Sequence, residues 1–109
     1  MEYFLNELQK TVKQMARTIA DEKILPVRAE LDEKEEFPWS IMKDLADTDL
    51  LGIYIPEEYG GLGGGCFELC LVTEELSRAC AGVAVSYAAN SLGSYTLLEY
   101  GSQEQKQKY

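Results

Sequence analysis

The amino-acid sequence predicts an all-α domain, a bundle of four to five helices that spans residues 1–109. Three observations support this fold class. Apolar residues recur every three or four positions over long stretches, glycine or proline marks the short connections between them, and the alternation typical of a strand is almost missing. A chain of 109 residues with 46% apolar side chains forms one domain at most and can bury a core.

The first predicted helix is amphipathic and occupies the N-terminal part of the chain. Pro26 should end or kink it near Ile24, because a proline ring clashes with the preceding helical turn. A turn or two should continue over residues 27–31, and the charged segment 32–37 is expected to form a loop. The apolar stripe of this helix consists of Phe4, Leu5, Leu8, Val12, Met15, Ala16, Ile19 and Ala20.

A second helix is predicted to begin at Pro38 and to end near Asp47, since proline is well tolerated in a first helical turn. Gly52 is expected to act as its C-terminal stop. Residues 53–55 should form a short extended piece before Pro56. The side chains available for burial are Trp39, Ile41, Met42 and Leu45.

Five of the nine glycines lie in the segment 57–65, between the second and third long helices. Glycine allows left-handed backbone and close approach, so we expect a tight, irregular turn. A dinucleotide-binding fingerprint would need the pattern G-x-G-x-x-G, but Cys66 takes the third glycine position when the pattern starts at Gly61. The segment is therefore interpreted as a structural turn and not as a phosphate cradle.

Three further helices are predicted after the glycine-rich turn. The third long helix runs over about residues 67–80, and a break near Gly82 leads into a fourth over about 83–100, which Gly101 ends. Ser102 can cap a fifth helix, with Glu104 and Gln105 near the capping-box position, and we expect the sequence to stop inside it. The stripe of the third helix is Phe67, Leu69, Cys70, Val72, Leu76 and Ala79.

The charge pattern excludes some classes of partner. The formal net charge is −9, which argues against nucleic acid or an anionic membrane, because both require clustered cations. No apolar run approaches the roughly 20 residues that span a bilayer. The start of the sequence resembles neither a signal peptide nor a transit sequence, so we expect a cytoplasmic protein of bacterial type, or one of the mitochondrial matrix after removal of a transit peptide.

The sequence offers few groups for catalysis or metal binding. It contains no histidine, which excludes Ser-His and Cys-His pairs. The three cysteines, Cys66, Cys70 and Cys80, lack the spacing of a zinc site and are interpreted as reduced, small apolar packing residues. Glu75 is expected to form an ion pair with Arg78, three positions along the helix, in preference to an acid–base role.

The fourth helix carries a stripe of small residues. Ala84, Ala88 and Leu92 are spaced at four-residue intervals, and Gly82, Ala89 and Gly93 are also small. Such a stripe either lets another helix approach closely or leaves room for a ligand. Spacing alone favours close packing.

The ordered set of motifs resembles the N-terminal helical domain of acyl-CoA dehydrogenases over nearly the whole chain. The glycine-rich turn follows the pattern P-E-x-x-G-G-x-G, which here begins at Pro56. The resemblance continues through Glu74-Glu75-Leu76-Ser77, Asn90-Ser91-Leu92-Gly93 and Gln105-Lys106-Gln107-Lys108-Tyr109, and upstream through Ile24-Leu25-Pro26, Phe37-Pro38 and Leu51-Gly52. Each motif is weak by itself, but their order and spacing are specific.

The resemblance implies a flavoprotein with an N-terminal helical domain, a middle β domain and a C-terminal helical bundle. Members hold FAD mainly between the last two parts, and a carboxylate and the flavin together convert an acyl-CoA to a trans-2-enoyl-CoA. Electrons typically pass to electron-transfer flavoprotein, and a homo-tetramer is the usual assembly. The base and the flavin motifs belong to those later parts, so no catalytic or cofactor-binding residue is assigned here. We expect the 109-residue chain alone to bind no FAD and to be inactive.

By the same resemblance, the fourth helix supplies one wall of the acyl pocket, with Ala84, Val85, Ala88 and Leu92 as the wall positions. Acyl length cannot be transferred from a relative, because Ala84 and Ala88 stand where some members carry larger or polar groups. Two alternatives stay open: a free-standing acidic helical interaction module without activity, and part of an acyl-CoA oxidase.

Overall fold

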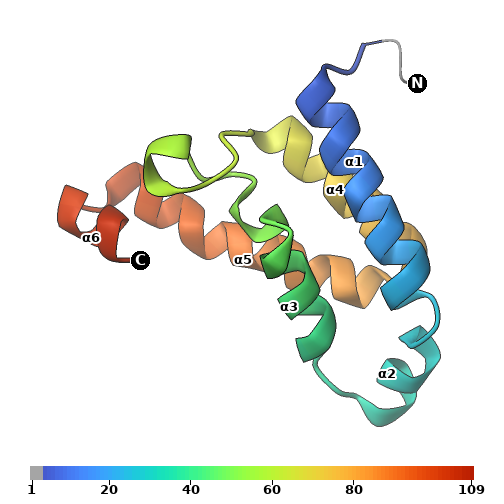
Figure 1. The fold of residues 1–109 in the computed structure, drawn as a ribbon. Coiled ribbons are helices and arrows are strands. Elements are labelled where there is room, and N and C mark those ends of the chain that lie inside the picture. Colours follow the sequence, from blue (N-terminus) through green and yellow to red (C-terminus); the bar gives the residue numbers. More distant parts are fainter. Residues whose placement is uncertain (1–3) are drawn as a thin grey trace.

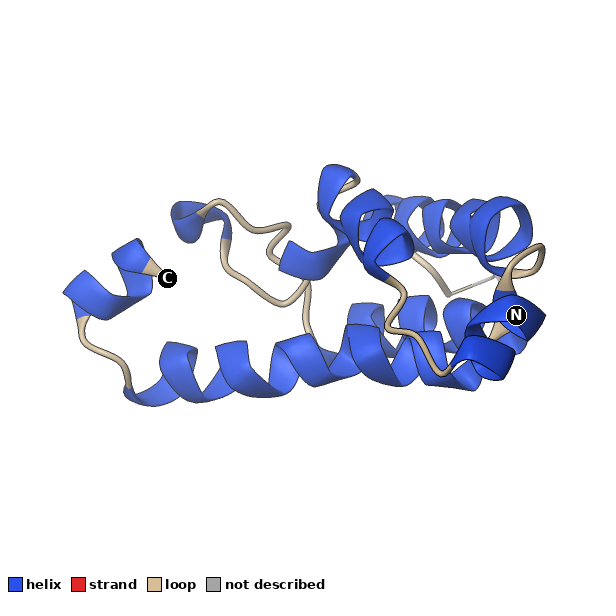
Figure 2. Cartoon of the chain, turned by 90° about the horizontal axis from the view of Figure 1, so that it is seen from below, coloured by secondary structure: helices blue, strands red, loops and turns tan. Residues whose placement is uncertain are grey.

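The computed structural model describes residues 4–109 and confirms the all-α prediction. Within that range the chain forms six α-helices and no strand (Figures 1 and 2). Helix α4 makes its main contacts with α1 on one side and α5 on the other, and α3 contacts α1 and the short turn that follows α3. The helices are α1 Glu7–Ile19, α2 Arg28–Lys34, α3 Trp39–Asp47, α4 Cys66–Ala79, α5 Ala81–Tyr100 and α6 Gln103–Lys108.

Helix α1 begins later than the apolar stripe suggested. Asn6 caps it, because its side chain accepts a hydrogen bond from the Gln9 N–H while the Gln9 side chain accepts one from the Asn6 N–H, both at 2.9 Å. Phe4 is 83% exposed and lies outside the helix, and Leu8 is also exposed. From Val12 onward the stripe is buried, except for half-buried Met15, and α4 packs against α1 there.

The first helix ends in a widened turn just before Pro26. Residues Ala20–Ile24 form a π-helical turn, in which the Leu25 N–H donates to the Ala20 carbonyl five residues earlier, at 3.0 Å. The wider turn relieves the clash that a proline ring makes with the carbonyl of the fourth residue before it. Helix α2 then extends to Lys34, so the loop predicted for residues 32–37 was wrong in its first half; left-handed Glu35 ends the helix.

The second predicted helix is confirmed as α3, but two expectations around it were wrong. Trp39 is 76% exposed and packs edge-on against Phe37, with ring centroids 4.6 Å apart, and does not enter the core. The helix ends before Asp49, which has φ of 61°, while Gly52 lies in a following 3-10 turn, Leu50–Gly52.

The segment 53–55 is a turn and not the extended piece that was predicted. Ile53 has φ of −57° and ψ of −35°. The turn forms because amides of the glycine-rich loop donate to its carbonyls: Gly63 to Ile55 at 2.9 Å and Gly64 to Ile53 at 2.8 Å. These bonds close the loop onto the backbone that precedes it.

The glycine-rich loop depends on glycine at particular positions. It begins with a 3-10 turn, Glu57–Tyr59, after which Gly60 and Gly63 adopt φ of 84° and 65°. A Cβ atom on Gly61 would lie 2.0 Å from the Ile55 carbonyl oxygen, so any side chain there would clash with backbone. A tight turn thus explains why this loop carries glycine at these positions.

Helix α4 is tied to α1 at its first turn. The Glu68 carboxylate accepts hydrogen bonds from the Gly65 N–H and from the Gln9 amide, both at 2.7 Å. These two donors hold the pKa of Glu68 below its ordinary value, the Gln9 bond having the larger effect. The predicted stripe of α4 was partly wrong: Phe67 and Cys70 are exposed, whereas Leu71, which was not predicted, is buried.

The last two helices follow the prediction closely, except at one boundary. The break before α5 falls at Cys80, which has extended backbone, and Gly82 lies inside the helix. Helix α6 is capped as predicted, since Ser102 and Gln105 exchange hydrogen bonds between side chain and backbone. It lies beyond the C-terminal end of α5 (Figures 1 and 2).

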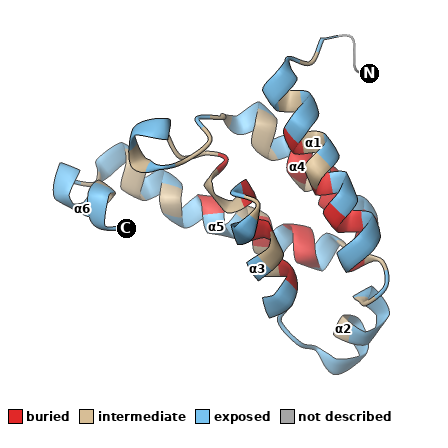
Figure 3. Cartoon of the chain, viewed as in Figure 1, coloured by how far each residue is buried: buried red, intermediate tan, exposed pale blue. Residues whose placement is uncertain are grey.

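The core lies where α1, α3, α4 and the N-terminal half of α5 face one another (Figure 3). Tyr87 is its largest fully buried side chain, and its hydroxyl donates to the Leu50 carbonyl at 3.0 Å. Burial raises the pKa of this hydroxyl. No helix in the described part of the chain is both long and apolar enough to cross a membrane.

Candidate functional site

The four predicted wall residues occupy different environments on α5. Ala84 is 2% exposed and belongs to the core, whereas Val85 is 67% exposed. Ala88 is half-buried, and Leu92 is 74% exposed. Ala88 and Leu92 therefore share an accessible surface, and the structure brings neither Ala84 nor Val85 into the hollow that they line.

This hollow has a volume of about 260 Å³ and lies between α5, the start of α4 and the turn at residues 53–55. Its lining has no charged side chain. It consists of Tyr54, Cys66, Leu69, Ala88, Ser91, Leu92 and Tyr95. We call it the α4–α5 hollow.

Two tyrosines lie together in the lining of the hollow. The rings of Tyr54 and Tyr95 meet edge to face, with centroids 5.8 Å apart. Burial raises the pKa of the Tyr54 hydroxyl, and the neighbouring Tyr95 adds to the shift. The hollow therefore presents two aromatic rings and no acidic or basic side chain, a lining suited to an uncharged ligand.

Sequence reasoning missed five of the residues that line the hollow. Ser91 and Tyr95 lie three and seven positions after Ala88, so helical spacing could have identified them. Tyr54, Cys66 and Leu69 could not be identified in this way, because only the packing of three separate elements brings them to α5.

The cysteines were predicted to be apolar packing residues, and this was wrong for two of them. Cys66 and Cys70 are exposed, and Cys80 is half-buried; all three are free thiols. Partial burial raises the pKa of the Cys70 thiol, and the adjacent Cys66 adds to this. Among residues 4–109, no three potential metal ligands of the His, Cys, Asp and Glu types group together.

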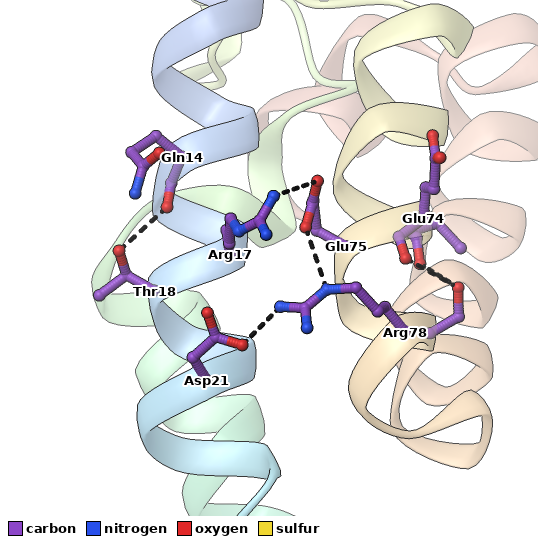
Figure 4. A network of polar contacts seen from close by, with 9 residues as sticks. Gln14, Arg17, Thr18, Asp21, Glu74, Glu75 and Arg78 are labelled. Carbon is purple, nitrogen blue, oxygen red and sulfur yellow. Dashed lines mark hydrogen bonds and ion pairs between the residues drawn. The ribbon is translucent and has the colours of Figure 1, made fainter.

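The predicted ion pair between Glu75 and Arg78 is confirmed, and it belongs to a larger network between α1 and α4 (Figure 4). The Glu75 carboxylate is almost fully buried; its Oε2 lies 3.5 Å from Arg78 Nε, and its Oε1 lies 3.9 Å from Arg17 Nη1. Arg78 also bonds to Asp21. A buried carboxylate would be costly without such cations, so the network joins the two helices.

The chain matches the model of the acyl-CoA dehydrogenase N-terminal domain over residues 6–109. The short-chain-specific acyl-CoA dehydrogenase of Clostridium acetobutylicum is 38% identical over 110 residues, which cover all of this chain and 29% of that protein. The acryloyl-CoA reductase (NADH) of Anaerotignum propionicum is 33% identical and is covered over 28% of its length.

A solved structure agrees with these sequence matches. Butyryl-CoA dehydrogenase from Megasphaera elsdenii superposes with a TM-score of 0.91 at 29% identity, over all of this chain and 30% of that one. The chain thus spans less than a third of the length of its relatives. The match to the domain model and the agreement in fold together show that this chain belongs to the acyl-CoA dehydrogenase family and corresponds to its N-terminal domain.

Proposed function

We propose that the complete protein is an FAD-dependent acyl-CoA dehydrogenase, which oxidises an acyl-CoA to the trans-2-enoyl-CoA, and that this domain supplies one wall of the acyl pocket. The observation that carries the proposal is the match of residues 6–109 to the family domain. The α4–α5 hollow supports it, because Ala88 and Leu92 line an uncharged surface of the kind that an acyl chain requires.

The wall would act by packing and by excluding water. Val85 and Leu92 expose large apolar side chains on α5, and covering them with substrate or with another domain would remove that surface from water. Ala84 stays in the proposal on the family resemblance alone, because the core covers its methyl group in this chain.

The residues of this chain do not fit an FAD site by themselves. The glycine-rich loop has no dinucleotide fingerprint, and several of its amides already donate to backbone carbonyls of residues 52–56. FAD would therefore be held by other parts of the complete protein, and we assign no chemical step of the reaction to residues 1–109.

The electron acceptor and the assembly are part of the same proposal. The family resemblance favours electron-transfer flavoprotein as acceptor and a homo-tetramer as assembly. The acryloyl-CoA reductase among the relatives shows that a matching domain also occurs in a protein named for the reverse chemistry. The direction of the reaction therefore has to be measured.

The test is expression of the complete reading frame, followed by anaerobic addition of acyl-CoAs of increasing length. A bound flavin whose visible absorbance is bleached by acyl-CoA, with enoyl-CoA as product, supports the proposal. A reading frame that ends after Tyr109 and gives no flavin supports the rival, an acidic helical interaction module. Hydrogen peroxide formed in step with acyl-CoA in air would instead indicate an acyl-CoA oxidase.

A further inference from the structure

Two cysteine thiols lie together on the exposed side of α4. Cys66 is the first residue of the helix and Cys70 follows four positions later, so their Cβ atoms project from one face, roughly 5–6 Å apart. Both residues are exposed and both thiols are free. Burial raises the pKa of the Cys70 thiol, and the Cys66 thiol raises it further, as expected for two sulfurs within reach of each other.

The helix holds the two sulfurs at a separation that suits a bridging atom better than a direct bond. A disulfide requires Cβ atoms about 3.5–4.5 Å apart, which is closer than residues four positions apart in a helix. The first turn of α4 resists distortion, because the Glu68 carboxylate accepts hydrogen bonds from the Gly65 N–H and the Gln9 amide, both at 2.7 Å. A metal ion can join the sulfurs without moving the helix, since metal–thiolate bonds are about 2.3 Å long and each thiol can rotate about its χ1 angle.

The surroundings of the pair specify the class of metal ion. Thiolates are soft ligands, which select copper(I), zinc and iron–sulfur clusters. A structural zinc ion takes four ligands, but in the described range 4–109 no third Cys, His, Asp or Glu groups with the two thiols. Glu68 lies between them in the sequence, and its carboxylate is already held by Gly65 and Gln9. Copper(I) is the ion that a pair of thiolates satisfies alone.

Space and charge at the pair favour the same ion. Cys66 also lines the α4–α5 hollow of about 260 Å³, so there is room for an ion beside this residue. A copper(I) ion between two thiolates carries one net negative charge. The first turn of a helix favours negative charge, because its N–H groups have no partner within the helix.

We propose that Cys66 and Cys70 form a two-coordinate site for a soft monovalent metal ion, copper(I). On binding, two S–H bonds break, two copper–sulfur bonds form, and the two protons pass to solvent. The copper stays monovalent, so the step needs neither an oxidant nor a reductant. The inference goes beyond the proposed function, because the metal takes no part in the oxidation of an acyl-CoA.

The first test measures copper on the complete protein. The reduced protein is loaded with copper(I) under anaerobic conditions, desalted in the presence of a competing copper(I) chelator, and analysed by atomic absorption. It should retain one more copper per chain than Cys66→Ser or Cys70→Ser, because the loss of one thiolate removes the chelate and should weaken binding on the order of a hundredfold or more. Cys80→Ser is the matched control: this half-buried thiol lies at the other end of α4, so the variant should retain as much copper as the unmodified protein.

The second test detects the pairing of the thiols without copper. The trivalent arsenic of phenylarsine oxide exchanges its oxygen for two sulfurs and releases one water, so paired thiols keep it in an excess of a monothiol and isolated thiols do not. Mass spectrometry of the peptide that contains residues 66–70 should find one arsenical on the unmodified protein and on Cys80→Ser. The same peptide from Cys66→Ser or Cys70→Ser should carry none.

Three results would overturn the inference. Equal copper in the unmodified protein, Cys66→Ser and Cys70→Ser would show an adventitious ion only. An arsenical at residues 66–70 without retained copper would show that the thiols are paired but do not hold the metal. Neither arsenical nor copper would show that the complete protein covers the thiols or holds them apart. All three leave the proposed function untouched, because the flavin and acyl-CoA assay tests it separately.

Discussion

Replacing Ala88 by phenylalanine in the complete enzyme should shorten the longest acyl group that is oxidised efficiently. Ala88 lies in the lining of the α4–α5 hollow and outside the core cluster. A phenyl ring at this position would enter the hollow of about 260 Å³ and displace the part of an acyl chain that lies there. Each excluded methylene corresponds to about 0.8 kcal/mol, so excluding two or three should lower kcat/KM by about tenfold to a hundredfold.

The assay is a series of acyl-CoAs of increasing length, measured on the same preparation as a thermal melt. Val83→Phe is the matched control, because Val83 lies on the same helix, is 3% exposed in the core and is not one of the proposed wall positions. That change should overpack the interior and lower the free energy of unfolding by about 1–3 kcal/mol without altering the ranking of substrates. If Ala88→Phe behaves in the same way, with a lower melting temperature and an unchanged ranking, the reasoning about Ala88 is refuted.

Four further predictions concern stability and the isolated chain. Gly61→Ala should lower the free energy of unfolding by about 3 kcal/mol, because the added Cβ would clash with the Ile55 backbone. Gly93→Ala is the control and should be neutral or stabilising, because no atom lies within 4 Å of a Cβ added there. Equal denaturant midpoints for the two variants would contradict this. Tyr87→Phe leaves the Leu50 carbonyl without its donor and should cost about 1–3 kcal/mol by urea denaturation. Because the pKa of Glu68 is lowered in the folded state, its carboxylate stabilises the fold at pH values above its unfolded pKa of about 4.5, and this contribution is lost as the pH falls through the folded pKa. Glu68→Gln should therefore lose less stability than the unmodified chain on acidification. Parallel curves of the free energy of unfolding against pH would contradict this. The 109-residue chain alone should bind no FAD by calorimetry and should self-associate in sedimentation, since it exposes large apolar side chains; a concentration-independent monomer would contradict the second point.

The helices could be predicted wherever a local signal determined them. The Ser102–Gln105 capping box and the long periodic stretches gave α6, α3, α4 and most of α1 within a few residues. The boundary at Pro26 was placed correctly, but its π-helical form was not, because periodicity does not distinguish a widened turn from an ordinary one.

The burial of particular side chains was harder to predict than the helices that carry them. Trp39 and Phe67 follow an apolar stripe in the sequence, yet they are 76% and 55% exposed. Gly52 was expected to stop α3, but Asp49 adopts the left-handed conformation, which aspartate tolerates better than most residues. Local propensity does not decide which of two nearby residues takes such a position.

Only the part of the candidate site that lies on α5 was predicted from the sequence. The sequence placed Ala88 and Leu92 on α5, and both line the hollow. The opposite side, from Tyr54 and Leu69, depends on how the glycine-rich loop folds back on residues 52–56 and leads into α4. No local pattern contains that information, since it arises from tertiary packing between distant parts of the sequence.

The uneven burial of α5 divides one continuous helix into two parts with different protection against solvent exchange. Its buried side chains, Val83, Ala84, Tyr87 and Ser91, all precede Leu92. Amide protons of the first part exchange only when the core opens, whereas those after Leu92 can exchange through local fraying that leaves the core intact. A substrate tail seated against Leu92 would therefore slow deuterium uptake most in the part of the helix that the chain itself protects least.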